Sequence, residues 1–108
     1  MKYAGTLLSD LEAIEKLPGF LGKFIHTGDM TLAYWDISKG SVLPEHAHMH
    51  TQIAQVISGE FAMVIDGEAH VFRAGNVVEI PGDVPHSGTA LTDCVIYDIF
   101  LPVREDLK

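Results

Sequence analysis

The chain has 108 residues, 47% of them hydrophobic, and a mean hydropathy of +0.19. These values are typical of a single compact domain (residues 1–108) and exclude a disordered or multidomain chain. Seven Lys and Arg against fifteen Asp and Glu give a net charge of -8, which argues against nucleic acid and anionic membranes as partners. Because so small a domain buries only about 60 to 65% of its unfolded surface alone, we expect a homodimer.

The cellular compartment can be inferred from a few residues. The single cysteine, Cys94, lies in an apolar run and cannot form an internal disulfide, which is typical of a buried thiol in a reducing compartment. Charges at Lys2, Asp10 and Glu12 leave no long apolar stretch for a signal peptide or a spanning helix. We therefore expect a cytoplasmic protein.

Residues 1–19 form a lead-in with a helical pattern. Ser9 and Glu12 have the spacing of a capping box, and apolar residues recur at helical spacing through Ile14 to Leu17. A Pro-Gly pair then ends the pattern. The segment predicts one or two helical turns.

Residues 20–101 read as many short β-strands, followed by a tail over residues 102–108. The predicted strands, rich in Val, Ile and aromatic residues, are Phe24–Thr27, Met30–Ile37, Gln52–Ile57, Phe61–Ile65, His70–Phe72, Val77–Ile80 and Cys94–Leu101. Turn residues separate them, and Asp66-Gly67 is the clearest hairpin signal. Strands at this even spacing predict an all-β sandwich or closed barrel.

A histidine-rich stretch carries the candidate metal ligands. His46, His48 and Gln52 share the same parity, so on one extended strand all three would point to the same face. A second stretch, a Gly turn, an apolar strand and a Pro-flanked loop, would bring His86 to them. Three imidazoles and an oxygen ligand suit one divalent transition metal, which could be Zn²⁺, Ni²⁺, Fe²⁺, Co²⁺ or Mn²⁺.

The spacing of these residues resembles the two motifs of the cupin superfamily. The first motif is matched by Gly40, His46, His48, Gln52 and Gly59, and the second by Gly75, Pro81 and His86. In the second motif Asp83 replaces a Gly and Ala90 replaces an Asn, neither of which is a metal ligand in the family pattern. The resemblance implies a single-domain cupin, a double-stranded β-helix or jelly-roll barrel, behind the short helical lead-in.

Gln52 stands where the cupin pattern has Glu. A Glu would offset half the charge of a divalent ion and offer a base beside it, whereas Gln coordinates through a neutral oxygen and takes no proton at neutral pH. The ion would keep its full charge, which favours Lewis-acid or isomerisation chemistry and disfavours a dioxygenase.

The C-terminal segment indicates which group of cupins the chain resembles. Residues 98–106, with the histidine-rich stretch, resemble the small pectin-degradation cupins of the KdgF type, which open 4,5-unsaturated uronates to linear 4-deoxy-5-keto uronates. The resemblance implies Asp98 as the acid/base, Arg104 as the contact to the substrate carboxylate or a catalytic group, and Phe100 as a pocket residue. Met49 and Thr51 depart from the Pro and Glu of that pattern, which bears on substrate preference.

Other interpretations of the same residues stay open. His50 shares the parity of the ligands, so an unbroken strand would aim it into the pocket as a substrate contact, whereas a bend near Met49 would turn it away. Asp98 could be a buried acid bonded to a tyrosine or a backbone amide, and Arg104 could belong to a solvated tail. The alternative function is a non-catalytic module that binds a metal or a sugar acid, such as a sensor.

Overall fold

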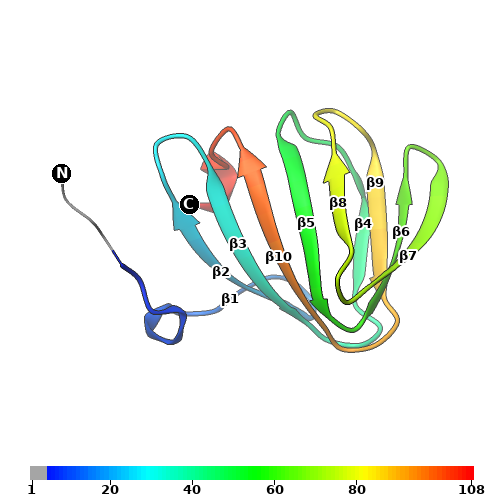
Figure 1. Cartoon of the computed structure of the whole chain (residues 1–108), viewed down its shortest axis with the longest axis horizontal. Helices are drawn as coiled ribbons and strands as arrows, with labels where there is room; N and C mark the ends of the chain where they lie inside the picture. Colours follow the sequence, from blue (N-terminus) through cyan, green and yellow to red (C-terminus); the bar gives the residue numbers. More distant parts are fainter. Residues whose placement is uncertain (1–4) are drawn as a thin grey trace.

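The computed structural model describes residues 5–108, and in them the short strands form two antiparallel sheets. Figure 1 shows the six-stranded sheet, of order β1-β2-β3-β10-β5-β8, beside the four-stranded sheet, of order β4-β9-β6-β7. The strands are β1 (Ile14–Leu17), β2 (Phe20–His26), β3 (Thr31–Ile37), β4 (Val42–His46), β5 (Thr51–Ser58), β6 (Glu60–Ile65), β7 (Glu68–Arg73), β8 (Val77–Ile80), β9 (His86–Ala90) and β10 (Cys94–Leu101). The all-β prediction is confirmed.

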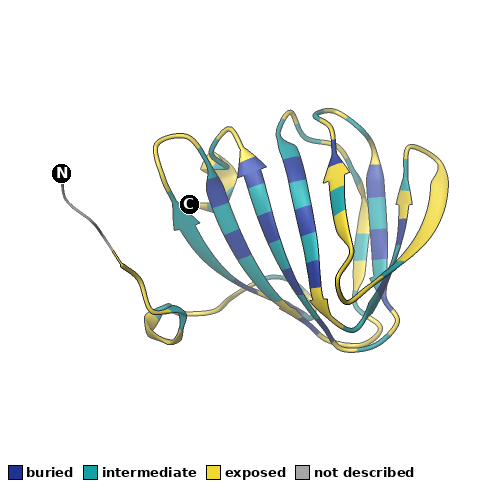
Figure 2. Ribbon diagram, in the orientation of Figure 1, coloured by how far each residue is buried: buried dark blue, intermediate teal, exposed yellow. Residues whose placement is uncertain are grey.

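Burial alternates along the central strands, because successive side chains of a strand point to opposite faces (Figure 2). In β10 the inward positions are Cys94, Ile96, Asp98 and Phe100, all of them buried. The apolar core gathers between the two sheets, and its most buried members include Phe20, Ile37, Val56, Phe61, Met63, Ile80 and Ile96.

The position of β10 decides what lies beside Asp98. This strand pairs with β3 on one side and β5 on the other, and Phe100 is directly opposite Gln52. Asp98 lies two residues along on the same inward face, so the two polar side chains are diagonal neighbours inside the barrel.

The predicted hairpin at Asp66-Gly67 is confirmed. It joins β6 to β7, and both residues have positive φ (49° and 81°), as a tight two-residue hairpin turn requires.

The lead-in is less helical than its pattern predicts. The helix is a single 3-10 turn, η1 (Leu8–Asp10), whose N-cap is Leu7 with no side-chain cap, so the predicted capping box is wrong. Ile14 and Leu17 lie on β1, which pairs with β2. A spacing of three residues in so short a segment does not distinguish helix from strand, and the backbone bonds offered by β2 decide the outcome.

The histidine-rich stretch is not one strand. β4 ends at His46 in the four-stranded sheet, β5 begins at Thr51 in the six-stranded sheet, and the chain bends at Met49 and His50. His86 is the first residue of β9, a strand that the sequence did not predict because Ser87-Gly88-Thr89 carries little β signal. The ligands therefore converge from two sheets rather than from one strand face.

A second 3-10 turn, η2 (Glu105–Leu107), follows β10 and lies by the ends of β3 and β10 in Figure 1. Neither helical turn of the described chain is long and apolar enough to cross a membrane.

Candidate metal centre and pocket

Three histidines meet where the two sheets come together. His46, at the end of β4, is the register partner of His86, at the start of β9, and their ring centroids are 4.3 Å apart. His48, from the connection between β4 and β5, lies 5.5 Å from His46 and 5.0 Å from His86 between ring centroids. One ring nitrogen from each histidine lies within 4.8 Å of the others, so the cluster could hold a metal ion.

Backbone carbonyls fix the orientation and tautomer of all three rings. Each Nδ1 is hydrogen-bonded to a main-chain oxygen, which can only accept, so Nδ1 carries the hydrogen and the Nε2 lone pair is free. The accepting carbonyls, for His46, His48 and His86 in turn, belong to Pro44 (2.9 Å), His50 (3.1 Å) and Val84 (2.9 Å). Such outer contacts are what metal-binding histidines use to aim their ligand nitrogen.

The donor set fits a divalent transition metal. The Nε2 atoms of His48 and His86 are buried without a partner, a costly state that a bound cation relieves. Burial lowers the pKa of His48 to about 4 and also lowers that of His86, so both are neutral ligands at pH 7. Gln52 is 8% exposed and lines the same cavity, where its carbonyl oxygen offers a neutral fourth ligand.

The histidines line a cavity of about 450 Å³ between the sheets. Its wall is mainly apolar and includes Phe20, Trp35, Val56, Phe61, Phe72 and Ile96. The charged side chains on the wall are Lys16, Glu45, Asp98, Arg104 and Asp106. An apolar cavity with a few convergent polar groups is typical of a site for a small molecule.

Asp98 is a buried acid with an unusual pKa. Its side chain is 7% exposed, the indole Nε1 of Trp35 donates to Oδ2 (3.0 Å), and Oδ1 is buried without a partner. Burial raises its pKa to about 7, although the side chains of Gln52 and Trp35 and the charge of Arg104 act in the opposite direction. A carboxyl of this kind can both accept and donate a proton near neutral pH.

Arg104 lines the cavity and does not lie in a solvated tail. Its side chain is only 13% exposed, and its Cζ lies 4.7 Å from the centroid of the Phe100 ring. Its Nε and Nη2 donate to the two carboxylate oxygens of Asp106, at 2.9 and 2.7 Å.

His50 lies outside the group of cavity-lining residues. The chain bends at Met49 and His50, and the His50 ring centroid is 5.6 Å from that of His48. Its carbonyl orients His48, and its own Nδ1 is buried without a partner.

Sequence reasoning missed several polar residues at the cavity, among them Trp35, Lys16 and Asp106. Trp35 has the aromatic side chain of an ordinary core residue, but an indole N–H needs an acceptor when it is buried, and that need could have indicated Asp98. Lys16 was hidden by the wrong helical interpretation of residues 14–17, and its Nζ lies 5.5 Å from the Phe24 ring centroid. Asp106 carried no signal beyond its place in an apparently solvated tail.

An antiparallel β-barrel with three convergent histidines in an apolar cavity is the arrangement that defines cupins. The chain belongs to the cupin family, since the family model described as "Cupin domain" matches residues 33–100. It is similar to the pectin degradation protein KdgF of Dickeya dadantii (strain 3937), with 31% identity over 80 residues that cover 72% of this chain and 73% of that protein. The resemblance predicted from the motifs is confirmed.

Two solved structures share the whole fold. KdgF from Halomonas sp. superposes with a TM-score of 0.92 at 26% identity, covering 99% of this chain and 100% of its own. An RmlC-like cupin from Shewanella frigidimarina NCIMB 400 also gives a TM-score of 0.92 at 26% identity, covering 99% of this chain and 97% of its own.

Proposed function

We propose that this protein opens the ring of 4,5-unsaturated uronates, released from pectin or alginate, to give linear 4-deoxy-5-keto uronates. The observation that carries the proposal is the cavity that combines three metal-competent histidines with the buried carboxyl of Asp98 and with Arg104. Similarity to KdgF supports the substrate class. The proposed enzyme is a cytoplasmic protein that acts on a small anionic sugar without nucleic-acid or membrane partners, as its net charge of -8 and its buried free thiol Cys94 suggest. It is proposed to be a homodimer because so small a domain buries only about 60 to 65% of its unfolded surface alone.

In the proposed site, His46, His48, His86 and the Gln52 oxygen would hold the divalent ion. Such an ion would supply Lewis acidity toward an oxygen of the sugar. Because Gln52 is neutral, the ligand set offsets none of the ionic charge, which supports this role over a dioxygenase.

Asp98 moves the proton in this mechanism. Its carboxylate takes the proton from the anomeric hydroxyl, the bond between the anomeric carbon and the ring oxygen breaks, and an aldehyde and an enolate are formed. The protonated Asp98 then delivers the same proton to C4, which turns the enolate into the 5-keto group and restores the carboxylate, so no net proton is consumed. A pKa of about 7 suits Asp98 to both transfers, and Arg104 binds the uronate carboxylate while Phe100 lines the pocket.

The test is an activity assay on purified protein with its metal restored. Turnover of an unsaturated galacturonate is followed by the loss of its ultraviolet enol-ether absorbance, and Asp98→Asn is expected to lower kcat by about 100-fold or more. Asp36→Asn, which removes an exposed carboxyl from β3, is the matched control and should keep full activity.

The other outcomes separate the alternatives. Full turnover by Asp98→Asn would show that the assigned proton transfer is wrong. A wild-type protein that binds metal and uronate but shows no turnover would be the non-catalytic module, and oxygen consumption with iron present would identify a dioxygenase.

A further inference from the structure

Arg104 is fixed on three sides as the chain leaves β10. Its backbone N–H donates to the Oγ1 of Thr31 (2.8 Å), a residue with no exposed surface at the start of β3. The same hydroxyl is bonded to Nδ1 of His26 (2.8 Å), which fixes its direction. The guanidinium lies over the ring of Phe100, and Asp106 pairs with one of its edges.

The contact with Asp106 uses only one edge of the guanidinium. A guanidinium has five N–H donors, arranged as a side edge (Nε and Nη2) and an end edge (Nη1 and the second hydrogen of Nη2). Asp106 accepts from Nε and Nη2 and therefore occupies the side edge. Among residues 5–108, no other acceptor is bonded to the Arg104 side chain, so the end edge keeps its capacity for a second carboxylate.

We propose that Asp106 is a positioning residue, which grips the side edge of Arg104 so that its end edge is presented to the carboxylate of the ligand. The proposal rests on the proposed function for the identity of that ligand, a uronate. Two parallel hydrogen bonds prevent rotation about the Nε–Cζ bond, so the ligand meets an ordered fork instead of a rotating one.

The charges of the pair fit this role. Asp106 is 60% exposed at its side chain while Arg104 is 13% exposed, so the acid sits at the rim and the cation faces inward. The hydrogen bonds from Arg104 lower the pKa of Asp106 to about 2, so the carboxylate is ionised at neutral pH. The opposite possibility is that Asp106 competes with the ligand for Arg104, and this predicts an effect of opposite sign.

The test compares two acids of the same terminal turn. Asp106→Asn removes the paired hydrogen bonds between the carboxylate and the Arg104 side chain. Glu105→Gln removes an equal charge from a residue paired with Lys108 and is the control. The chain has only two arginines, Arg73 and Arg104, so ¹⁵N spectra of the guanidinium groups are simple, and Arg73→Lys assigns them. The probe is D-galacturonate titrated into zinc-loaded protein, because zinc is diamagnetic.

In wild type and Glu105→Gln we expect resolved Nη signals of Arg104 that shift as galacturonate binds. In Asp106→Asn we expect these signals to merge through rotation and the dissociation constant to rise by about tenfold. With unsaturated galacturonate, KM should rise by a similar factor while kcat stays within about twofold, a split that a general loss of structure would not give.

Each other result overturns the proposal. Unchanged binding of galacturonate by Asp106→Asn would show that Asp106 has no role in binding, and tighter binding would show that it competes with the ligand. If the Arg104 signals of the wild type do not shift when galacturonate is added, Arg104 does not contact the carboxylate of the ligand. Failure of the proposed function is distinguishable, because it appears as binding through Arg104 without turnover.

Discussion

At the scale of single residues, the candidate site combines neutral candidate ligands with a buried acid. Gln52 brings an oxygen without a charge, and burial keeps His48 neutral. Asp98, their neighbour, is the one buried carboxyl on the cavity wall in the described chain, and the same burial holds its proton to about pH 7. The metal-free site therefore contains opposing titrations that stability measurements can separate.

The first prediction concerns the stability of the metal-free protein between pH 4 and pH 7. The pKa of Asp98 is raised from 3.8 to about 7 on folding, so the folded state holds the proton more tightly and the free energy of unfolding falls as pH rises through this window. At about 1.4 kcal/mol per pKa unit, the full effect is about 4 kcal/mol. His48, with its pKa lowered from 6.5 to about 4, acts oppositely and stabilises the fold as pH rises from 4 to 6.5.

A comparison of the Asp98→Asn variant with the wild type isolates the contribution of Asp98 to the pH dependence of stability. Asp98→Asn keeps the histidines, so its unfolding free energy minus that of wild type, from urea titrations, should grow by up to about 4 kcal/mol from pH 4 to pH 7. Asp36→Asn should follow the wild type across the window. A constant difference for Asp98→Asn would show that the carboxyl is not held protonated by burial.

At the scale of elements, the metal centre depends on how the segment between β4 and β5 is held. Gly82 packs against this segment, where an added Cβ would collide with the carbonyl oxygen of Met49. The next amide, that of Asp83, donates to the carbonyl oxygen of His48 at 2.7 Å. The loop before β9 therefore holds the backbone of His48 and Met49 in place through these two contacts.

Gly82→Ala should consequently weaken metal binding. The methyl group forces the segment at Met49 to shift, which we expect to destabilise the fold by about 1 to 3 kcal/mol and to lower zinc affinity by at least about tenfold. Gly28→Ala is the control, because nothing lies within 4 Å of its added Cβ. Zinc competition titrations would contradict the idea if Gly82→Ala lost stability but bound zinc as tightly as wild type.

The sequence predicts which residues are candidate metal ligands, but it does not predict the path of the chain that brings them together. His46, His48 and His86 are recognisable because imidazoles at these spacings have few structural uses, and strand periodicity defines most of the barrel. The bend at Met49 between His46 and Gln52 is only one of two alternatives that the sequence leaves open, since the choice depends on β4 and β5 joining different sheets. Contacts made by the tail, such as Arg104 with Thr31, are 73 residues apart in the chain and leave no local pattern.

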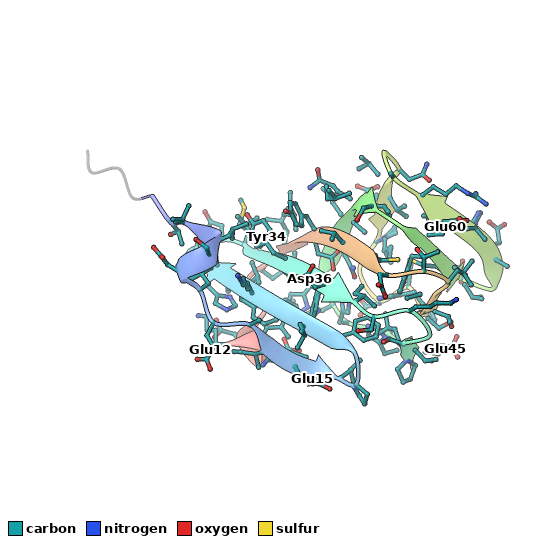
Figure 3. All side chains as sticks on the ribbon, turned by 90° about the horizontal axis from the view of Figure 1, so that it is seen from below. Glu12, Glu15, Tyr34, Asp36, Glu45 and Glu60 are labelled. Atoms are coloured by element: carbon teal, nitrogen blue, oxygen red, sulfur yellow. The ribbon has the colours of Figure 1, made fainter. Side chains whose placement is uncertain are left out.

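At the scale of the whole molecule, a protein with a net charge of -8 is proposed to bind an anion. The acidic side chains labelled in Figure 3 lie along the whole length of the molecule, with Glu12 and Glu15 toward one end, Glu60 toward the other and Asp36 between them, so the negative charge is spread over the surface. In the proposed function the local attraction would come from a bound ion, Arg104 and Lys16, and Arg104 already shares its charge with Asp106. Lys16 forms no ion pair within the described residues and is thus the least compensated side-chain cation on the cavity wall.

Ionic strength sets the distance over which these charges act on an approaching ligand. The Debye length is about 30 Å at 10 mM salt, comparable to the molecular extents of 44 × 27 × 24 Å, and about 8 Å at 150 mM. At low salt the repulsion from the whole surface acts on an approaching uronate, whereas at 150 mM only charges near the cavity do. We therefore expect kcat/KM for the anionic substrate to rise as salt increases from 10 to 150 mM.

Two lysine variants separate the local charge from the total. Lys16→Gln and Lys39→Gln change the net charge equally, but only Lys16 lines the cavity with the histidines. At 150 mM salt, Lys16→Gln should raise KM by about threefold, a typical value for one partly exposed ion pair, while Lys39→Gln stays at the wild-type value. At 10 mM both variants should lose kcat/KM, because both add to the surface repulsion. Equal KM values for the two variants at 150 mM would mean that Lys16 does not contact the ligand and that the metal and Arg104 supply the attraction alone.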